Sequence, residues 1–563
     1  MNSALNATIN AAMQNGRELE ADVVIIGAGV GGCGAALAAA EAGVRVILTE
    51  ETDWIGGQLT TQITPPDEHG WIERFGCTAS YRKYRDAVRA YYREHYPLTP
   101  EARANPRLNP GNGWVSPLCH EPRVALAVLQ SLLAPHVASG RLRVLTRHAP
   151  TGASLGTGGA GDTIAAVAVQ DLEENVTRWL RGRYFLDATE LGDLIAACGA
   201  ESVTGAESQD DTGEPSAPAV ANPTNAQAFS VCCVFDHREG EDHTMERPVR
   251  YDYWRDFVPA LTPAWTGRLL SWTAPHPRTM EPITYAFAPN AECAKAFAGL
   301  WSYRRILDRT QLTPGAADSD LCVVNWVMLD HTGGDLVTAS AAERRAREED
   351  AREQTRSVVY WLQTEAPRAD GGAGWPGLRL RGDVTGTDDG LAKSAYIRES
   401  RRLRAMTRVV EPHVSAALRA ETHPGDVLGE RYADSVGIGY YRIDLHPSVG
   451  GDNYIDVAAL PFRIPLGALV PVRIQNLIAA AKNIGTTHVT NGCYRLHPVE
   501  WNIGEAAGAL AAHCVRGEVT PQQVASDSGR TEAFQRHLTA RGVELAWPET
   551  LTLDEGDPHA HAR

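Results

Sequence analysis

The segment between residues 22 and 50 constrains the fold more than any other part of the chain. Residues 22–26 (DVVII) form a short apolar run that ends in glycines, which predicts a buried parallel strand. The alanine-rich stretch from about 31 to 42 predicts a helix, and residues 44–49 (VRVILT) predict a second strand. A strand, a glycine-rich turn, a helix and a second strand within about 30 residues make a complete βαβ unit.

The glycine-rich turn of this unit, Gly27-Ala-Gly-Val-Gly-Gly32, has the GxGxxG pattern of dinucleotide-binding folds. Gly27 permits the tight turn out of the strand, Gly29 lets the backbone approach a diphosphate, and Gly32 lets the helix pack closely on the sheet. Val30 and Gly31 lie at the start of the helix, whose first N–H groups and partial positive charge attract phosphate. The sequence therefore predicts a dinucleotide site at this turn.

Two acidic residues follow the second strand. Glu50, with Glu51 beside it, stands where a carboxylate accepts hydrogen bonds from adenosine ribose hydroxyl groups. A second GxGxxG match at 156–161 has no strand before it and no helix after it, so we interpret residues 151–162 as a turn. Residues 152–156 match the GxSxG pattern of hydrolases but lack the strand-to-helix elbow that exposes the serine, so we treat that match as chance.

Two further segments distinguish FAD from NAD. Gly57 and Gln58, in the sequence WIGGQ, resemble the segment that runs along the cofactor in FAD enzymes of the glutathione-reductase class. Asp187 and Ala188 resemble the strand end that usually reads Asp-Ala-Thr-Gly in flavoproteins, although Glu190 stands where the glycine is usual. Since one strand–turn–helix motif with this context is present, we expect FAD and no separate NAD(P)H domain.

Together these segments resemble the FAD-dependent oxidoreductase family over residues 22–514. Further segments of the resemblance are 434–439 (DSVGIG), 461–465 (PFRIP), 476–481 (NLIAAA) and 495–498 (RLHP). The resemblance implies an α/β fold, in which a Rossmann-type FAD-binding domain of the glutathione-reductase type carries an inserted α+β substrate domain. It implies FAD as the cofactor and an oxidoreductase activity, and it identifies no substrate.

The pattern along the chain predicts four stretches. Residues 20–205 and 431–520 carry the apolar strand and helix patterns expected of the two parts of the FAD-binding domain. Residues 206–430, rich in tryptophan and proline, are predicted to form the substrate domain, and a helix from about 339 to 364 is its clearest element. Residues 521–563 are predicted to be a C-terminal helix and tail. Residues 179–188 are predicted to form one strand.

A helix predicted from about 498 to 515 is expected to hold the flavin ring. Its small residues allow backbone N–H groups to approach a ligand, and its N-terminus would stabilise the negative charge of reduced flavin. We therefore expect Asn502, Ile503 and Gly504 to contact the flavin. The alternative is that the small residues serve close packing of the helix on the sheet.

His488 and His497 flank the turn before that helix, where a histidine donates to the flavin or takes a substrate proton. His446 is a third candidate, and the alternative for each is a structural histidine. Arg398 and Arg401 belong to a basic cluster that suits a substrate carboxylate, and internal pairing with acids such as Glu399 is the alternative. Further arginine candidates are Arg442, Arg463 and Arg495.

Composition excludes several other classes. The 563 residues carry a formal net charge of −16, which argues against nucleic-acid binding. The ten cysteines contain no CxxC pair, so a dithiol reductase is not expected, and no metal-binding motif is found. We find no signal peptide and no apolar run of about 18 residues, so we expect a cytoplasmic protein that does not bind membranes.

These features predict oxidation of a small organic substrate by hydride transfer to FAD. The electron acceptor and self-association into a homo-oligomer stay open. Two alternatives remain: a flavin-dependent reductase of an activated C=C bond, and a non-catalytic flavin-binding protein.

Overall fold

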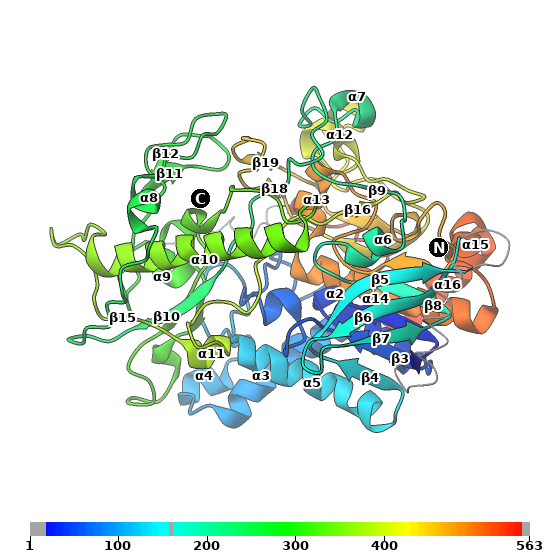
Figure 1. Ribbon diagram of the computed structural model, residues 1–563, viewed down its shortest axis with the longest axis horizontal. Helices are drawn as coiled ribbons and strands as arrows, with labels where there is room; N and C mark the ends of the chain where they lie inside the picture. Colours follow the sequence, from blue (N-terminus) through cyan, green and yellow to red (C-terminus); the bar gives the residue numbers. More distant parts are fainter. Residues whose placement is uncertain (1–17, 157–161, 295, 554–563) are drawn as a thin grey trace.

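The computed structural model describes residues 18–156, 162–294 and 296–553. At its centre lies a five-stranded parallel sheet in the order β21-β8-β2-β3-β4 (Figure 1). Its strands are short and rich in valine, isoleucine and leucine, and all but the edge strand β4 are fully buried, as expected of a parallel sheet covered on both faces. The bounds are β2 (Val23–Ile26), β3 (Val46–Thr49), β4 (Leu142–Leu145), β8 (Tyr184–Asp187) and β21 (Leu477–Ala479).

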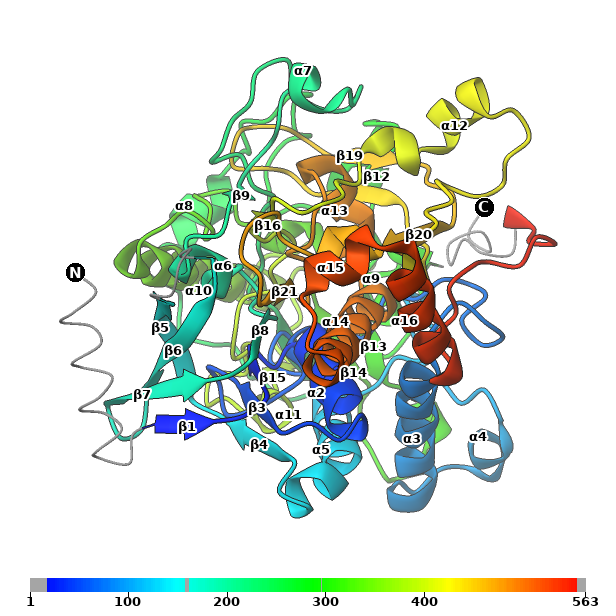
Figure 2. The same cartoon turned by 90° about the vertical axis from the view of Figure 1, so that its right-hand side faces the viewer.

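A mixed sheet lies on one face of this parallel sheet, and helices lie on the other, so that Figure 2 shows the layers edge-on. The mixed sheet has the order β1-β7-β6-β5, in which β1 runs parallel to β7 and the other pairs are antiparallel. Its strands are β1 (Glu18–Glu20), β5 (His148–Leu155), β6 (Ile164–Asp171) and β7 (Val176–Arg181). The predicted α/β fold with a Rossmann-type parallel sheet is thereby confirmed.

Two sequence-based expectations in this region were wrong. The single strand predicted over 179–188 is two strands, β7 and β8, which belong to different sheets. The chain crosses between them at Gly182, where a Cβ would lie 2.9 Å from Cγ2 of Val24. The turn predicted over 151–162 begins later, because residues up to Leu155 extend β5, and residues 157–161 lie outside the described part. Ser154 of the GxSxG match therefore sits in a strand and not on an elbow.

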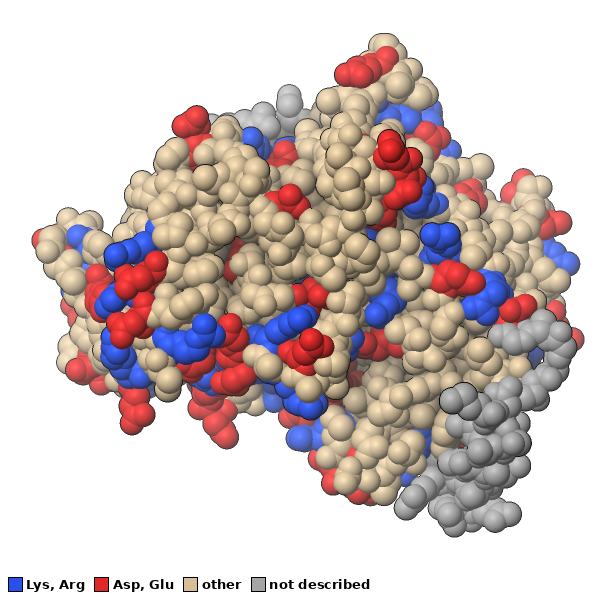
Figure 3. All heavy atoms as spheres, turned by 45° about the horizontal axis from the view of Figure 1, so that its top comes forward, with Lys and Arg blue, Asp and Glu red and all other residues tan. Residues whose placement is uncertain are grey.

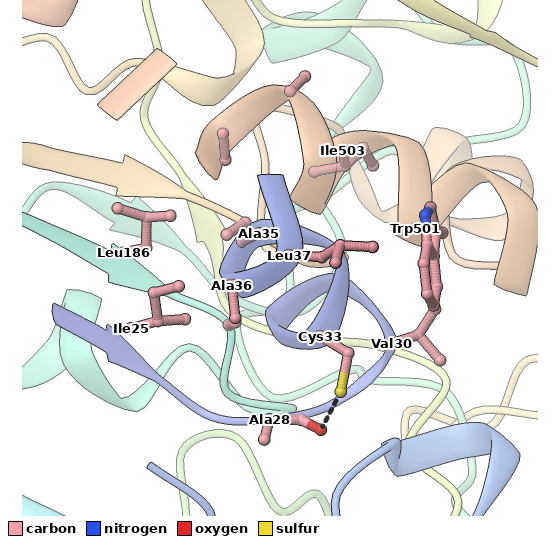
Figure 4. Packing of buried hydrophobic residues seen from close by; sticks show 14 of the residues in the cluster. Ile25, Ala28, Val30, Cys33, Ala35, Ala36, Leu37, Leu186, Trp501 and Ile503 are labelled. Carbon is pink, nitrogen blue, oxygen red and sulfur yellow. Dashed lines mark hydrogen bonds between the residues drawn. The ribbon is translucent and has the colours of Figure 1, made fainter. Parts of the chain in front are cut away.

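Helix α14 (His497–Gly517) lies directly on helix α2 (Val30–Glu41). A Cβ on Gly504 would lie 1.9 Å from the carbonyl oxygen of Gly31, and a Cβ on Gly508 would lie 2.1 Å from that of Ala35. Figure 4 shows Leu37 of α2 facing α14, while the sheet lies on the other side of α2. The glycines of α14 therefore permit backbone-to-backbone packing of two helices at the centre of the core.

The middle of the chain builds a second sheet, in the order β13-β14-β10-β15. Helix α10 (Ala341–Thr364) covers it and begins at a capping box formed by Ser340 and Glu343. The core beneath is rich in aromatic residues, including Phe235, Trp301 and Trp326. The strands are β10 (Cys233–His237), β13 (Arg305–Leu307), β14 (Leu321–Val324) and β15 (Leu378–Leu380). The sequence did not predict these strands, because runs of three to five residues carry little periodicity.

The remaining elements surround these sheets and cores. The helices are α3 (Ala79–His95), α4 (Pro100–Ala104), α5 (Pro122–Ala138), α6 (Asp193–Ala197), α7 (Gln209–Thr212), α8 (Tyr251–Asp256), α9 (Leu300–Tyr303), α11 (Gly382–Thr385), α12 (Ala416–Thr422), α13 (His488–Tyr494), α15 (Pro521–Ser526) and α16 (Ser528–Ala540). The strands pair as β9 (Ser202–Val203) with β16 (Arg402–Leu403), β11 (Thr273–Pro275) with β12 (Pro282–Thr284), β17 (Ser435–Gly439) with β20 (Phe462–Pro465), and β18 (Ile443–Leu445) with β19 (Ile455–Val457).

Within the described ranges, none of the helices combines the length and the apolar character needed to cross a membrane. On the face drawn in Figure 3, basic and acidic side chains are intermixed and do not gather into a basic patch.

The packing of α14 on α2 predicts the effect of a single methyl group. Gly508→Ala places a Cβ into the carbonyl group of Ala35, so the helices must separate, and we expect a loss of about 1–3 kcal/mol in the free energy of unfolding. Gly517→Ala is the matched control, because its Cβ would meet only the side chain of Val519 at 3.4 Å. Thermal or urea unfolding measures both, and equal stability of the two variants would contradict this packing.

Candidate functional site

The glycine-rich turn lies at the carboxyl end of β2, in the middle of the parallel sheet. Gly27 has a φ of +95°, and a Cβ there would lie 2.4 Å from the carbonyl oxygen of Ala188, so a side chain is excluded. Gly57 of the second glycine segment lies against this turn, because its Cβ would be 2.8 Å from Cα of Gly29. The two segments form a cradle of bare backbone, which is what a diphosphate needs to approach.

The first turn of α2 continues this cradle. Val30 is buried, and a Cβ on Gly31 would lie 2.0 Å from the carbonyl oxygen of Ala480. A Cβ on Gly32 would lie 2.1 Å from the carbonyl oxygen of Gly27. The helix N-terminus therefore sits close to both the sheet and the turn, with its partial positive charge at the cradle.

Glu50 faces the glycine-rich turn from the end of β3. Its Oε2 accepts a hydrogen bond from the amide of Ala28 at 3.1 Å, and its Oε1 accepts from the amide and the hydroxyl group of Thr52, both at 3.0 Å. The side chain is half-buried, and desolvation by the surrounding protein raises its pKa to about 7. Glu51 is exposed. Of the two predicted acids, Glu50 is thus the one held beside the cradle.

Asp187 is buried at the end of β8. Its Oδ1 accepts from the amide of Thr189 at 2.9 Å and from its hydroxyl group at 2.7 Å, and its Oδ2 accepts from the amide of Ile195 at 2.7 Å. Burial raises the pKa of Asp187 to about 6, against the effect of these hydrogen bonds. The carboxylate fixes the turn that places Ala188 against Gly27, and contact of either residue with a cofactor stays a prediction.

The sequence did not predict a buried cluster of charged and polar side chains that lies next to the cradle. Nζ of Lys482 forms an ion pair with Glu190 and lies 3.6 Å from Oε2 of Glu500. Nε2 of Gln58 donates to Oε2 of Glu500 at 2.6 Å and to the carbonyl oxygen of Arg495 at 3.1 Å. We call Gln58, Glu190, Lys482 and Glu500 the carboxylate–lysine cluster. Lys482 closely follows strand β21. Its position at the carboxyl end of a parallel strand is the sequence feature that could have identified it as a site residue.

The carboxylate–lysine cluster holds more acceptors than it can satisfy. Oε1 of Glu190 and Oε1 of Glu500 are buried without a hydrogen-bond partner, and both lie beside Gly29, at 2.8 and 3.8 Å from the position of a Cβ. Burial raises the pKa of Glu500 to about 7, opposed by Lys482 and reinforced by Glu190. The side-chain amide of the nearby Gln62 is also buried and unpaired. Unpaired buried groups around a bare backbone cradle fit a site shaped for a polar ligand.

The two predicted histidines differ in charge. Burial alone would lower the pKa of His488, but Glu399, whose carboxylate oxygens lie 2.9 and 3.0 Å from its Nδ1, holds the pKa above the usual value. Burial and nearby cations lower the pKa of His497 well below the usual range. Nδ1 of His497 accepts from the amide of Asp67 at 3.1 Å, and its Nε2 lies 3.4 Å from Oγ1 of Thr64. His488 is thus a buried cation and His497 a neutral ring.

The predicted arginines are held by the protein itself. Arg398 forms an ion pair with Asp330 at 2.9 Å and donates to the carbonyl oxygen of Ala228 at 2.9 Å. Arg401 donates to the carbonyl oxygens of Gly192 and Val337 at 3.2 and 3.1 Å. These contacts correspond to the internal pairing that the sequence left open, and a direct role in substrate binding stays a prediction.

The three residues expected to contact the flavin ring, Asn502, Ile503 and Gly504, lie just after the first turn of α14. Nδ2 of Asn502 donates to the carbonyl oxygen of Val436, and its Oδ1 accepts from the amide of Ile438, which ties α14 to β17. Ile503 lies in the core, and Gly504 is the residue that meets α2. Their contact with flavin stays a prediction, and the close packing that was its alternative is present.

A cavity of about 280 Å³ opens in the middle part of the chain, lined in part by residues that directly follow β11 and by residues of the β18–β19 hairpin. Its wall combines seven aromatic side chains with seven ionisable ones. The aromatic wall is formed by Tyr285, Phe297, Tyr303, Trp326, Tyr440, Tyr441 and Tyr454, and the ionisable residues are His276, Arg278, Arg304, Arg442, Asp444, His446 and Asp456.

Short chains of contacts join this cavity to the cradle. Arg304 in the cavity wall lies 3.7 Å from Asp67, whose amide donates to His497. Arg495 lies 3.2 Å from Asp444 in the cavity wall, and its carbonyl oxygen accepts from Gln58. The cavity therefore adjoins the carboxylate–lysine cluster, as a substrate site next to a bound dinucleotide would.

The comparisons with known proteins fit this geometry. The family model described as "FAD dependent oxidoreductase" matches residues 22–538. No curated protein matches the sequence significantly.

Solved structures of flavoenzymes are similar to parts of the chain. L-proline dehydrogenase from P. horikoshii is 17% identical over 35% of this chain and 26% of its own, with a TM-score of 0.17. OxyS anhydrotetracycline hydroxylase from Streptomyces rimosus is 15% identical over 69% of this chain and 54% of its own, with a TM-score of 0.25. This chain therefore spans about a quarter of the first structure and about half of the second.

These two similarities are too low to support any argument about function. The match of the family model to nearly the whole chain, together with the parallel sheet and its glycine cradle, shows that the chain belongs to the FAD dependent oxidoreductase family, whose cofactor is FAD.

Proposed function

We propose that this chain oxidises a small organic substrate, bound in the aromatic cavity, by hydride transfer to FAD held in the glycine cradle. The observation that carries the proposal is the adjacency of the two sites through Asp67, His497 and Arg495. FAD, when bound, supplies a two-electron acceptor. The residues of the chain bind it, orient the substrate and take up the proton.

In this proposal, different residues of the cradle bind different parts of FAD. Gly27, Gly29 and the N-terminus of α2 offer backbone N–H groups to the diphosphate, and Glu50 accepts hydrogen bonds from the adenosine ribose. Lys482 supplies the buried ammonium group of the carboxylate–lysine cluster. It supports the proposal that the diphosphate passes beside Gly57 and Gln58.

His446 is best placed to accept the substrate proton. It lines the cavity, and its Nδ1 lies 2.8 Å from Oδ2 of Asp330. Burial alone would raise the pKa of Asp330, but Arg398 and His446 keep it below the usual value, so this carboxylate is ionised and holds the proton on Nδ1 of His446. Nε2 is then left to accept a proton. In this arrangement Arg398 is a positioning residue, which acts through Asp330.

The cradle predicts that FAD binding depends on the absence of a side chain at Gly29. Gly29→Ala adds a Cβ that would lie 2.8 Å from Oε1 of Glu190, in the path of the diphosphate, and we expect FAD affinity to fall at least about tenfold. Gly152→Ala is the control, because its Cβ meets nothing within 4 Å. FAD titration by fluorescence quenching compares the two, and undiminished binding by Gly29→Ala would refute the cradle as the binding site.

The raised pKa of Glu50 predicts that FAD affinity depends on pH. The carboxylate accepts the ribose hydrogen bonds in its ionised form, and its raised pKa of about 7 means that acidification removes this form. One pH unit below the pKa leaves about a tenth of it ionised. Through Glu50 alone, affinity at pH 6 should be about tenfold weaker than at pH 8.

Glu500 titrates in the same range and acts in the opposite sense, because its protonation favours a nearby diphosphate. The comparison that isolates Glu50 is thus the ratio of wild-type to Glu50→Gln affinity. This ratio should fall about tenfold from pH 8 to pH 6. A ratio that does not change with pH would show that Glu50 does not bind the ribose as an anion.

If His446 accepts the substrate proton, its substitution should slow flavin reduction without affecting FAD binding. His446→Gln should lower the rate of flavin reduction by about 10²–10⁴-fold while FAD content stays at the wild-type level. Anaerobic stopped-flow mixing with alcohols, amines and carboxylic acids identifies the substrate and measures the rate. His276→Gln, also in the cavity wall, is the matched control, and an equal loss in both variants would rule out His446 as the specific proton acceptor.

A further inference from the structure

Arg304 differs from the other arginines in the cavity wall in how its charge is compensated. Arg442 is held by Asp456 at 2.5 Å, and Arg278 lies 3.5 Å from the same carboxylate. For Arg304 the nearest carboxylate oxygen belongs to Asp67 at 3.7 Å, which is beyond hydrogen-bond distance. Arg304 therefore has an ion-pair neighbour, but its Nε and Nη1 have no hydrogen-bond acceptor among the described residues.

The guanidinium group of Arg304 is also buried. Its side chain is 11% exposed, and its Nε and Nη1 are inaccessible to solvent and lack a hydrogen-bond partner. Its Cζ lies 5.2 Å from the ring centroid of Tyr303, which covers one face of the group. Burial alone would lower the pKa of Arg304, but Asp67 raises it, so the group is charged. Because Arg304 also lines the cavity, an anion bound there would offset the cost of burying this cation.

The shape of the cavity limits what that ligand can be. Its volume of about 280 Å³ is at the small end of the range for ligand pockets. Seven of the residues that line it are aromatic, with Phe297 and Trp326 among them, so the cavity suits a flat apolar body. Among small anions, a carboxylate pairs well with a guanidinium group.

We propose that Arg304 anchors the carboxylate of the substrate, and that the substrate class is small carboxylic acids with an aromatic or other apolar body. That the bound acid is a substrate rests on the proposed function, whereas the anion site itself does not depend on FAD chemistry. Arg398 and Arg401 are less suited to this role, because Arg398 pairs with Asp330 and donates to Ala228, and Arg401 donates to Gly192 and Val337.

Isothermal titration calorimetry on the full chain, with and without FAD, tests the anchor with benzoate, benzamide and phenyl phosphate. Benzamide has the shape of benzoate without its charge. We expect benzoate to bind at least tenfold more tightly than benzamide. Equal binding of the two, or binding of phenyl phosphate in preference to benzoate, would overturn the inference.

Variants locate the effect at Arg304. Arg304→Met should weaken benzoate at least tenfold and leave benzamide unchanged, and Arg304→Lys should keep part of the preference, because it keeps the charge and loses the fork. Arg278→Met, at an arginine that shares Asp456, is the matched control and should keep the wild-type preference. Retention of the full benzoate preference by Arg304→Met would overturn the inference. A circular dichroism melt identifies a variant that fails to fold, and then Arg304→Lys alone decides, with unchanged benzoate preference counting against the inference.

The two proposals fail in different ways. If benzoate binds through Arg304 but no compound reduces the flavin, the hydride-transfer proposal fails and the anchor stands. If neutral alcohols or amines reduce the flavin and Arg304→Met does not change their rates or those of carboxylic acids, the anchor fails and the oxidase chemistry stands.

Discussion

The backbone contact between α2 and α14 determines where the chemistry of this chain can occur. Gly504 and Gly508 bring α14 within touching distance of the carbonyl groups of Gly31 and Ala35. This contact carries the first turn of α14 to the glycine-rich turn, so that Oε1 of Glu500 lies 3.8 Å from the position of a Cβ on Gly29. A segment near the end of the chain thereby completes a site begun near residue 27, and the long middle segment is free to build the cavity beside it.

Charge at the cradle is the second constraint. Two carboxyl groups, Glu190 and Glu500, share the ammonium group of Lys482 next to the glycine-rich turn. A diphosphate in the cradle would add negative charge there, so its binding would favour protonation of Glu500, whose pKa is raised to about 7.

The sequence predicted the parts of the fold that depend on local patterns. The βαβ unit, the acid after its second strand and the long helix α10 follow from apolar periodicity, glycine spacing and capping residues, and the structure has them close to the expected bounds. The strands of the second sheet were missed because they are too short to show periodicity. The division of residues 179–188 between two sheets depends on tertiary packing at Gly182, which no local pattern records.

The site was predictable to the extent that it is built from motifs. Gly27, Gly29, Gly57 and Glu50 lie together as their motifs require. Glu500 and Arg304 could not be identified, because their importance comes from burial and from neighbours hundreds of residues away, Gln58 and Asp67. Arg398 was selected for its charge, yet its partner Asp330 makes it a support for His446, and only the fold reveals that pairing.

Anaerobic reduction of the bound flavin tests the central claim most directly. The purified protein is loaded with FAD, its visible spectrum is recorded before and after acid precipitation, and it is mixed without oxygen with alcohols, amines and carboxylic acids. The account predicts a yellow protein whose absorbance bleaches with one class of small substrate. A protein that takes up no FAD would contradict the cradle, and bound FAD that no substrate bleaches would contradict the proposed hydride transfer.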